Sequence, residues 1–154
     1  MTNKIIYFVA NWKMYGNLKS LKSLNKVIKF SKSKEIKKGR LIYCPPYTLI
    51  SSFLKKFKNC LIDIGGQNCH ESEDYGSHTC FVNSKMLKSS GANYVILGHS
   101  ENRRKGETDK LINLKIKSAI KAKLKVIFCI GETLTEKKRK KTKSILSKQI
   151  KRGG

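Results

Sequence analysis

The sequence predicts an α/β fold built on a parallel sheet. Short apolar runs alternate with stretches in which apolar residues recur at helical spacing, and this alternation occurs five times along the chain. Polar side chains follow several of the apolar runs directly, as they do where strands end in parallel α/β proteins. With 154 residues and 39% hydrophobic content, the chain is long enough for one domain with a substantial core.

Five short apolar runs are expected to form the strands of this sheet. They cover residues 5–10, 41–44, 61–65, 94–97 and 126–130. Pro45 and Pro46 close the second run, because proline lacks the backbone N–H that a strand needs for pairing.

Amphipathic stretches between these runs predict helices whose apolar stripes pack on the sheet. The stripes comprise Leu18, Leu21, Leu24 and Ile28; Ile50, Phe53, Leu54 and Phe57; Leu111, Ile112, Ile116, Ala119 and Ile120; and Ile145, Leu146 and Ile150. Thr108 is expected to begin the helix that carries the third stripe. Gly39 and Gly91 are expected to end the helical segments that precede them.

This order of elements admits two architectures, a doubly wound sheet or part of a (β/α)₈ barrel. A doubly wound dinucleotide-binding protein carries a glycine-rich turn after its first strand. Residues 11–13 (Asn-Trp-Lys) are no such turn, and residues 65–68 and 131–132 lack the G-x-G-x-x-G spacing. We therefore do not expect a dinucleotide site.

Composition excludes several further classes of protein. No run of about 18 or more uncharged apolar residues predicts a membrane span, and no secretory leader is recognisable, so we expect a cytoplasmic protein. The five cysteines include no Cys-x-x-Cys pair, which argues against structural zinc or a disulfide framework. Cys69-His70 and His78-x-Cys80 lack a second pair of ligands, so we expect no metal site.

The formal net charge of +24 invites the interpretation that the protein binds a polyanion. Lysine outnumbers arginine 29 to 5, however, and is spread over nearly every predicted helix rather than gathered with aromatic residues on one face. A coding bias accounts for such a composition, and the densest run, residues 137–141, fits a solvated helix face. We expect no nucleic-acid or membrane partner from this pattern.

Two strand ends carry the residues that most strongly suggest chemistry. His99 and Glu101 follow the run at 94–97, and Asn11 and Lys13 follow the first run. Because parallel strands present their carboxyl ends at one edge, these four side chains are expected to share a site.

Five short motifs, one after each expected strand, resemble the triosephosphate isomerase family. They are residues 11–14 (Asn-Trp-Lys-Met), 44–46 (Cys-Pro-Pro), 65–68 (Gly-Gly-Gln-Asn), 98–101 (Gly-His-Ser-Glu) and 129–132 (Cys-Ile-Gly-Glu). The resemblance implies a (β/α)₈ barrel, here an incomplete barrel of five βα units in a single partial domain, residues 1–154, that lacks the last three units.

The resemblance also implies an activity and a set of roles. The family interconverts dihydroxyacetone phosphate and glyceraldehyde 3-phosphate, a step of glycolysis and gluconeogenesis, by proton transfer through an enediolate and without cofactor or metal. His99 matches the electrophile, Lys13 and Asn11 match substrate-binding residues, and Glu101 matches a supporting acid. Residues 69–80 resemble the loop through which the family forms homodimers, although Thr79-Cys80-Phe81 stands where Thr-Gly-Glu is usual.

The general base, the mobile lid and the phosphate-binding loops of the family have no counterpart in these residues. Glu132 matches a structural position and is not expected to replace the base. We therefore expect an isomerase sequence that is truncated and whose 154 residues alone are inactive. The alternatives are a non-catalytic fragment or pseudoenzyme and, third, a basic nucleic-acid-associated protein.

Overall fold

The computed structural model describes residues 5–33, 36 and 39–153, and these form one curled sheet with helices along one side. The five strands are β1 (Ile6–Asn11), β2 (Gly39–Cys44), β3 (Ile62–Gly66), β4 (Tyr94–Leu97) and β5 (Lys125–Phe128). Every strand pairs in parallel with the next one along the chain, in the order β1-β2-β3-β4-β5. The sheet is therefore the arc of a barrel, as the sequence predicts, and not a doubly wound sheet.

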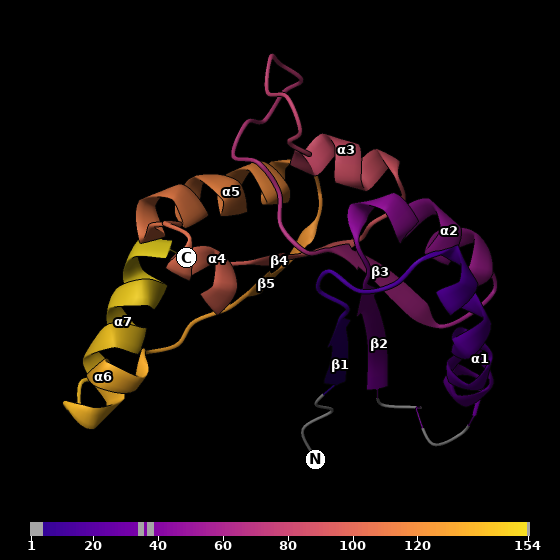
Figure 1. Cartoon of the computed structure of the whole chain (residues 1–154), viewed down its shortest axis with the longest axis horizontal. Coiled ribbons are helices and arrows are strands. Elements are labelled where there is room, and N and C mark those ends of the chain that lie inside the picture. The colour runs from indigo at the N-terminus through magenta and orange to yellow at the C-terminus, as the bar shows by residue number, and fades with distance from the viewer. Residues whose placement is uncertain (1–4, 34–35, 37–38, 154) are drawn as a thin grey trace.

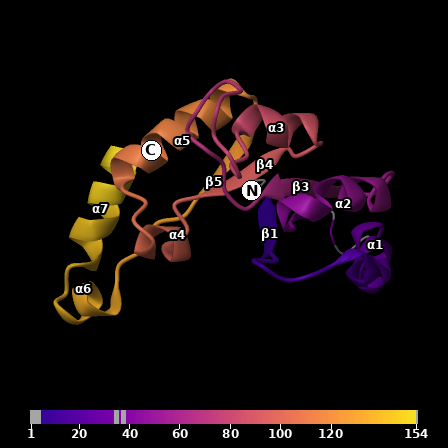
Figure 2. The same cartoon turned by 45° about the horizontal axis from the view of Figure 1, so that its top comes forward.

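The helices follow the chain around the outside of this arc, as both views show (Figures 1 and 2). The first connection contains the 3₁₀ helix η1 (Leu18–Leu24) and α1 (Asn25–Ser31), and the second contains η3 (Tyr47–Leu49) and α2 (Ile50–Lys56). Then come α3 (Ser84–Ser89), α4 (Ser100–Arg104), α5 (Asp109–Lys121), α6 (Leu134–Lys138) and α7 (Thr142–Gly153). Within the described residues, no helix combines the length and apolar character needed to cross a membrane.

Two apolar layers, one on each face of the sheet, hold the arc together. The outer layer contains Leu41 of β2 and Val95 and Leu97 of β4, which pack against helix residues such as Phe53 and Ile112. The inner layer consists of Ile42, Cys44, Tyr94 and Ile96, with Ile127 and Cys129 against them. All four residues of β4 are buried, which explains its unbroken apolar sequence, since a central parallel strand is covered on both faces.

One predicted helix stop is wrong. Gly39 is the first residue of β2, opposite Ile6 of β1, and α1 ends at Ser31. A side chain at Gly39 would collide with Ile36, whose Cδ1 lies 2.5 Å from the position of a Cβ, so close packing explains this glycine. Gly91 behaves as predicted, with a φ of +95° two residues beyond α3.

Candidate active site

A hollow of about 270 Å³ lies at the edge of the sheet where the strands end at their carboxyl termini. All four residues singled out from the sequence line it: Asn11, Lys13, His99 and Glu101. Asn11 ends β1, and His99 and Glu101 stand at the junction of β4 and α4. The structure thus brings together two segments that are 88 residues apart in the sequence.

Lys13 is held in a backbone conformation that a lysine rarely adopts. Its φ is +52°, in the left-handed region, which costs a residue with a side chain about 1 kcal/mol. The Oδ1 of Asn11 accepts a hydrogen bond from the Lys13 amide at 2.9 Å, and Gln67 Nε2 donates to the Lys13 carbonyl at 2.7 Å. Gln67 also donates to the Cys44 carbonyl at 2.9 Å, so it ties the turn to the end of β2.

The side chain of Lys13 reaches Glu101 across the hollow. The Nζ and Oε1 atoms are 3.0 Å apart, and both side chains are nearly half exposed. The hydrogen bond from Lys13, reinforced by its charge, holds the pKa of the Glu101 carboxyl below its ordinary value of 4.5. Glu101 is thereby an anion that orients Lys13.

His99 caps the N-terminus of α4 with its own ring. The Glu101 amide donates to Nδ1 of His99 at 3.3 Å, which requires an unprotonated Nδ1 and leaves the proton on Nε2. Oε2 of Glu101 lies 3.5 Å from the same Nδ1 and would favour the opposite assignment. We assign the Nε2-protonated tautomer, because the amide is the nearer group and Lys13 already neutralises the carboxylate.

The preceding residue must be glycine for this geometry. Gly98 has a φ of +74°, and a Cβ on it would lie 2.8 Å from the carbonyl oxygen of Cys129. The chain therefore turns sharply out of β4 and delivers His99 to the hollow.

Four further lining residues had not been assigned to the site from the sequence, namely Tyr47, Gln67, Asn68 and Asn102. Gln67 and Asn68 belong to the motif after the third strand, which was the available signal. The hydroxyl of Tyr47 donates to the Asn68 carbonyl at 2.7 Å. This contact joins two segments that are distant in the sequence, so no local sequence pattern predicts it.

A buried ion pair behind the hollow fixes Asn68. Lys115 and Glu107, whose side chains are at most 10% exposed, pair with one another. Asn68 Nδ2 donates to Glu107 Oε1 at 2.8 Å, and Lys115 donates to Asn68 Oδ1 at 3.3 Å. Three hydrogen bonds thus join Asn68 to α5 and to Glu107 at one wall of the hollow, while Oε2 of Glu107 is buried without a hydrogen-bond partner among the described residues.

Within the described residues, the lining of the hollow holds no carboxylate besides Glu101. Glu132 lines a second hollow of about 870 Å³, which adjoins the first because His99 lines both, and its Oε1 accepts a hydrogen bond from the Thr142 hydroxyl at 3.1 Å. Burial raises the pKa of the Cys44 thiol to about 12, so this neighbour of the site stays protonated at neutral pH. The described lining of the 270 Å³ hollow offers a cation and an imidazole, and its one carboxylate, Glu101, is engaged by Lys13.

A parallel (β/α) sheet curled into an arc, with a lysine, a histidine and a glutamate joined at the carboxyl ends of its strands, is typical of the (β/α)-barrel class of protein. A sequence model of triosephosphate isomerase matches residues 6–153. The chain belongs to the triosephosphate isomerase family.

Individual relatives agree with this assignment. The triosephosphate isomerase of Dictyoglomus thermophilum is 39% identical over 155 aligned residues, which cover 99% of this chain and 60% of that enzyme. The enzyme of Wolbachia pipientis wMel is 42% identical, over 93% of this chain and 56% of its own length. The crystal structure of the Bartonella henselae enzyme superimposes with a TM-score of 0.89 at 35% identity and covers 96% of this chain and 61% of that one. The chain thus spans about 60% of the length of these relatives.

Proposed function

We propose that these residues form the substrate-polarising half of a triosephosphate isomerase site. In this reaction a base removes a proton next to a carbonyl, and the resulting enediolate is reprotonated on the neighbouring carbon. The proposed site interconverts dihydroxyacetone phosphate and glyceraldehyde 3-phosphate in the cytoplasm, within glycolysis and gluconeogenesis. The observation that carries the proposal is the connected set Lys13–Glu101–His99 in one hollow.

Each residue has a role that follows from its contacts. Nε2–H of His99 would donate to the substrate carbonyl, because Nδ1 is engaged by the Glu101 amide. The ammonium of Lys13 would stabilise the oxygen on which negative charge develops, and would attract the substrate phosphate. Asn11 shapes the turn of Lys13, and Glu101 supports both Lys13 and the histidine. The proton-abstracting base is proposed to come from three further βα units that complete the barrel domain.

The proposal includes a homodimer assembled through residues 69–80. His70 pairs with Asn83 and its amide donates to the Val82 carbonyl at 2.8 Å, so the base of this loop is closed. Tyr75 on this loop and Phe81 directly after it are 70% and 61% exposed. Such apolar side chains on a closed, projecting loop suit contact with a second copy.

Fragment complementation tests the activity. Residues 1–154 are purified alone and mixed with the part of the Bartonella henselae enzyme that the structural match leaves uncovered. Isomerase turnover is then followed in a coupled assay. We expect negligible turnover from residues 1–154, turnover from the mixture, and a loss of at least about 100-fold when Lys13→Ala or His99→Gln is introduced.

Lys19→Ala is the matched control, because Lys19 is an exposed lysine outside the hollow; it should change turnover by less than about twofold. A folded mixture without turnover would make the chain a non-catalytic member of the family. Turnover that is insensitive to Lys13→Ala would refute the assigned site. Sedimentation of the active mixture should give two copies of each fragment.

A further inference from the structure

The side chain of Gln67 fastens the turn that carries Lys13 to the body of the sheet. Its Nε2 donates to the Lys13 carbonyl at 2.7 Å and to the Cys44 carbonyl at 2.9 Å. Lys13 follows β1, Cys44 ends β2 and Gln67 follows β3, so one amide group joins the ends of three strands. Among the described residues, no other group donates a hydrogen bond to the Lys13 carbonyl.

The two glycines before Gln67 bring it close enough to make these contacts. Gly65 and Gly66 end β3. A Cβ on Gly65 would lie 2.6 Å from the Sγ of Cys44, and a Cβ on Gly66 would lie 2.7 Å from a methyl carbon of Leu87. Any larger residue would push β3 away from these neighbours. The Gly-Gly-Gln sequence therefore sets the position from which the Gln67 amide reaches both carbonyls.

The position calls for a donating amide group. Both acceptors are carbonyl oxygens, so the NH₂ group of Gln67 must face them, which fixes the orientation of the amide. An NH₂ group has two hydrogens, and each is used by one carbonyl. Gln67 lines the hollow, but its donating group is thus fully engaged by the backbone and cannot also serve a bound molecule.

Lys13 depends on such a support because of its backbone conformation. Its φ of +52° is one that a residue with a side chain keeps only where its surroundings enforce it. Asn11 accepts a hydrogen bond from the Lys13 amide, but it lies only two residues away and constrains the turn locally. Gln67 supplies the anchor from outside the turn. Without it, the peptide group after Lys13 could rotate and direct the ammonium away from Glu101.

We infer that Gln67 is a positioning residue of the proposed isomerase site. By holding the Lys13 carbonyl, it keeps the Lys13 ammonium beside Glu101 and within reach of a bound substrate. In the described chain, Gln67 forms no hydrogen bond with Glu101 or His99, so it acts through Lys13. The role in turnover rests on the proposed function, whereas the placement of Lys13 against Glu101 can be measured without any turnover.

The first measurement compares residues 1–154 with the variant Gln67→Met, which keeps the length and neutrality of the side chain but removes its donors. Carbon-13 NMR follows the titration of the Glu101 carboxyl, whose pKa the hydrogen bond from Lys13 holds below its ordinary value. Gln67→Met should raise this pKa toward the ordinary value, as Lys13→Ala should. An unchanged titration in the folded variant would overturn the inference.

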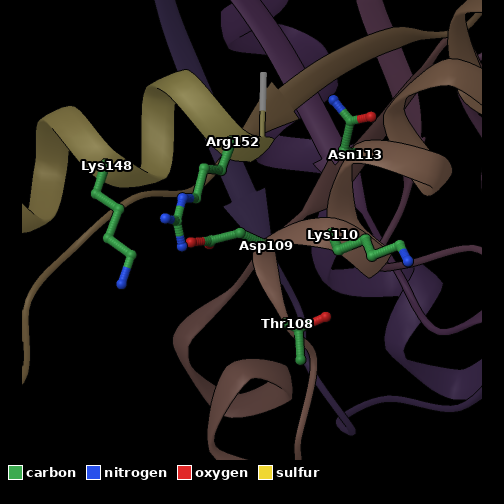
Figure 3. A pocket seen from close by; sticks show the side chains of 6 residues that line it. All are labelled: Thr108, Asp109, Lys110, Asn113, Lys148 and Arg152. Carbon is green, nitrogen blue, oxygen red and sulfur yellow. The ribbon is translucent and has the colours of Figure 1, made fainter.

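Gln149 provides the matched control, because it also braces the backbone with one amide group. Its Oε1 accepts from the Gly131 amide at 2.8 Å, and its Nε2 donates to the Gly131 carbonyl at 2.9 Å. It lies on α7, whose Lys148 and Arg152 line a hollow of about 470 Å³ against α5 (Figure 3). Gln149→Met also loses two hydrogen bonds but should leave the Glu101 titration unchanged. Equal shifts in both variants would show a general loosening of the fold and refute the role of Gln67.

The second measurement follows isomerase turnover in the mixture of residues 1–154 with the complementing fragment. Gln67→Met should lower kcat/KM by about 10- to 100-fold, as expected for a displaced ammonium. In a Lys13→Ala background the same substitution should cost less than about twofold, because Gln67 acts through Lys13. Equal losses in the two backgrounds would mean a purely structural role and overturn the inference. A mixture without turnover would count against the proposed function, and the Glu101 titration would still decide the role of Gln67.

Circular dichroism establishes whether each variant is folded. If Gln67→Met unfolds, Gln67→Asn takes its place, because it keeps the amide but is one methylene too short to span both carbonyls. Gln67→Asn should also raise the pKa of Glu101. Unfolding of both variants would show that Gln67 supports the fold as a whole rather than Lys13, and would overturn the inference.

Discussion

The contact between Lys13 and Glu101 makes a residue-level prediction about pH. The pKa of Glu101 is lowered mainly by the hydrogen bond from Lys13. A depressed pKa in the folded state means that the contact stabilises the fold above the ordinary pKa of 4.5, and that this stabilisation disappears as the pH falls through the folded value. Lys13→Ala should therefore raise the pKa of Glu101 toward its ordinary value.

Carbon-13 NMR of the Glu101 side-chain carboxyl, followed from pH 7 downward, measures this shift. Lys85→Ala is the control, because it removes the lysine that pairs with Asp74 and should move the titration of Asp74 instead. An unchanged Glu101 titration in Lys13→Ala would contradict the assigned contact.

At the residue scale, the sequence predicted several residues that line the hollow, but not the residues that hold them in place. Asn11, Lys13, His99 and Glu101 could be found because each follows an apolar run, and chain topology brings such positions together. The role of Gln67 could not be assigned, since its side chain donates to the carbonyl of Lys13, in the turn after β1, and to the carbonyl of Cys44, at the end of β2. Contacts of this kind depend on the curvature of the sheet and leave no periodic trace.

At the element scale, Thr108 offers a clean test of helix capping. Thr108 is the N-cap of α5, the longest α-helix among the described residues, and its Oγ1 accepts a hydrogen bond from the Leu111 amide at 3.2 Å. Thr108→Ala leaves that amide without its partner and should lower the free energy of unfolding by about 1 kcal/mol.

Chemical denaturation followed by circular dichroism measures the loss. The control Thr135→Ala changes an exposed threonine in the interior of α6 and should alter stability by less than about 0.5 kcal/mol. Equal losses from the two substitutions would show that the cap contributes nothing specific.

Element boundaries were predicted to within a few residues, and the exceptions have physical causes. Residues 94–97 match β4, and Thr108 begins α5 as expected. The stripe Leu18, Leu21, Leu24 and Ile28 was expected in one helix, but η1 changes into α1 after Leu24. A spacing of three residues suits the 3₁₀ helix as well as the α-helix, so the stripe alone could not distinguish them.

At the scale of the whole molecule, the edge strand β1 exposes a run of apolar side chains. Ile6, Tyr7 and Phe8 are successive residues and each is more than half exposed, so both faces of the strand meet solvent. An unpaired apolar edge is a template for association. A 154-residue polypeptide should therefore form concentration-dependent oligomers, and Ile6→Lys should shift it toward monomer.

Sedimentation velocity over a range of concentrations measures this shift. The control Ile120→Lys introduces the same charge at an isoleucine that is 61% exposed on α5, away from the edge, and should leave association unchanged. If both substitutions shift the oligomers toward monomer equally, net charge rather than the exposed edge of β1 governs association.

The architecture of the whole molecule needed more than periodicity. Alternating strands and helices admit both an open doubly wound sheet and a barrel, because the same βα unit builds either one. The strand order and the outer layer of helices identify the sheet as the arc of a barrel, and the structural match to a triosephosphate isomerase agrees. The five family motifs anticipated this outcome, because each marks the end of a strand.

The agreement between strand order and chain order also bears on how the molecule is made. Each strand finds its partner in the strand synthesised just before it, so a nascent chain can extend the sheet one βα unit at a time from β1 onward. Pairing of neighbours along the chain keeps the loops that must close short, which lowers the entropic barrier to folding. The arc can thus grow on the ribosome before the final residues emerge.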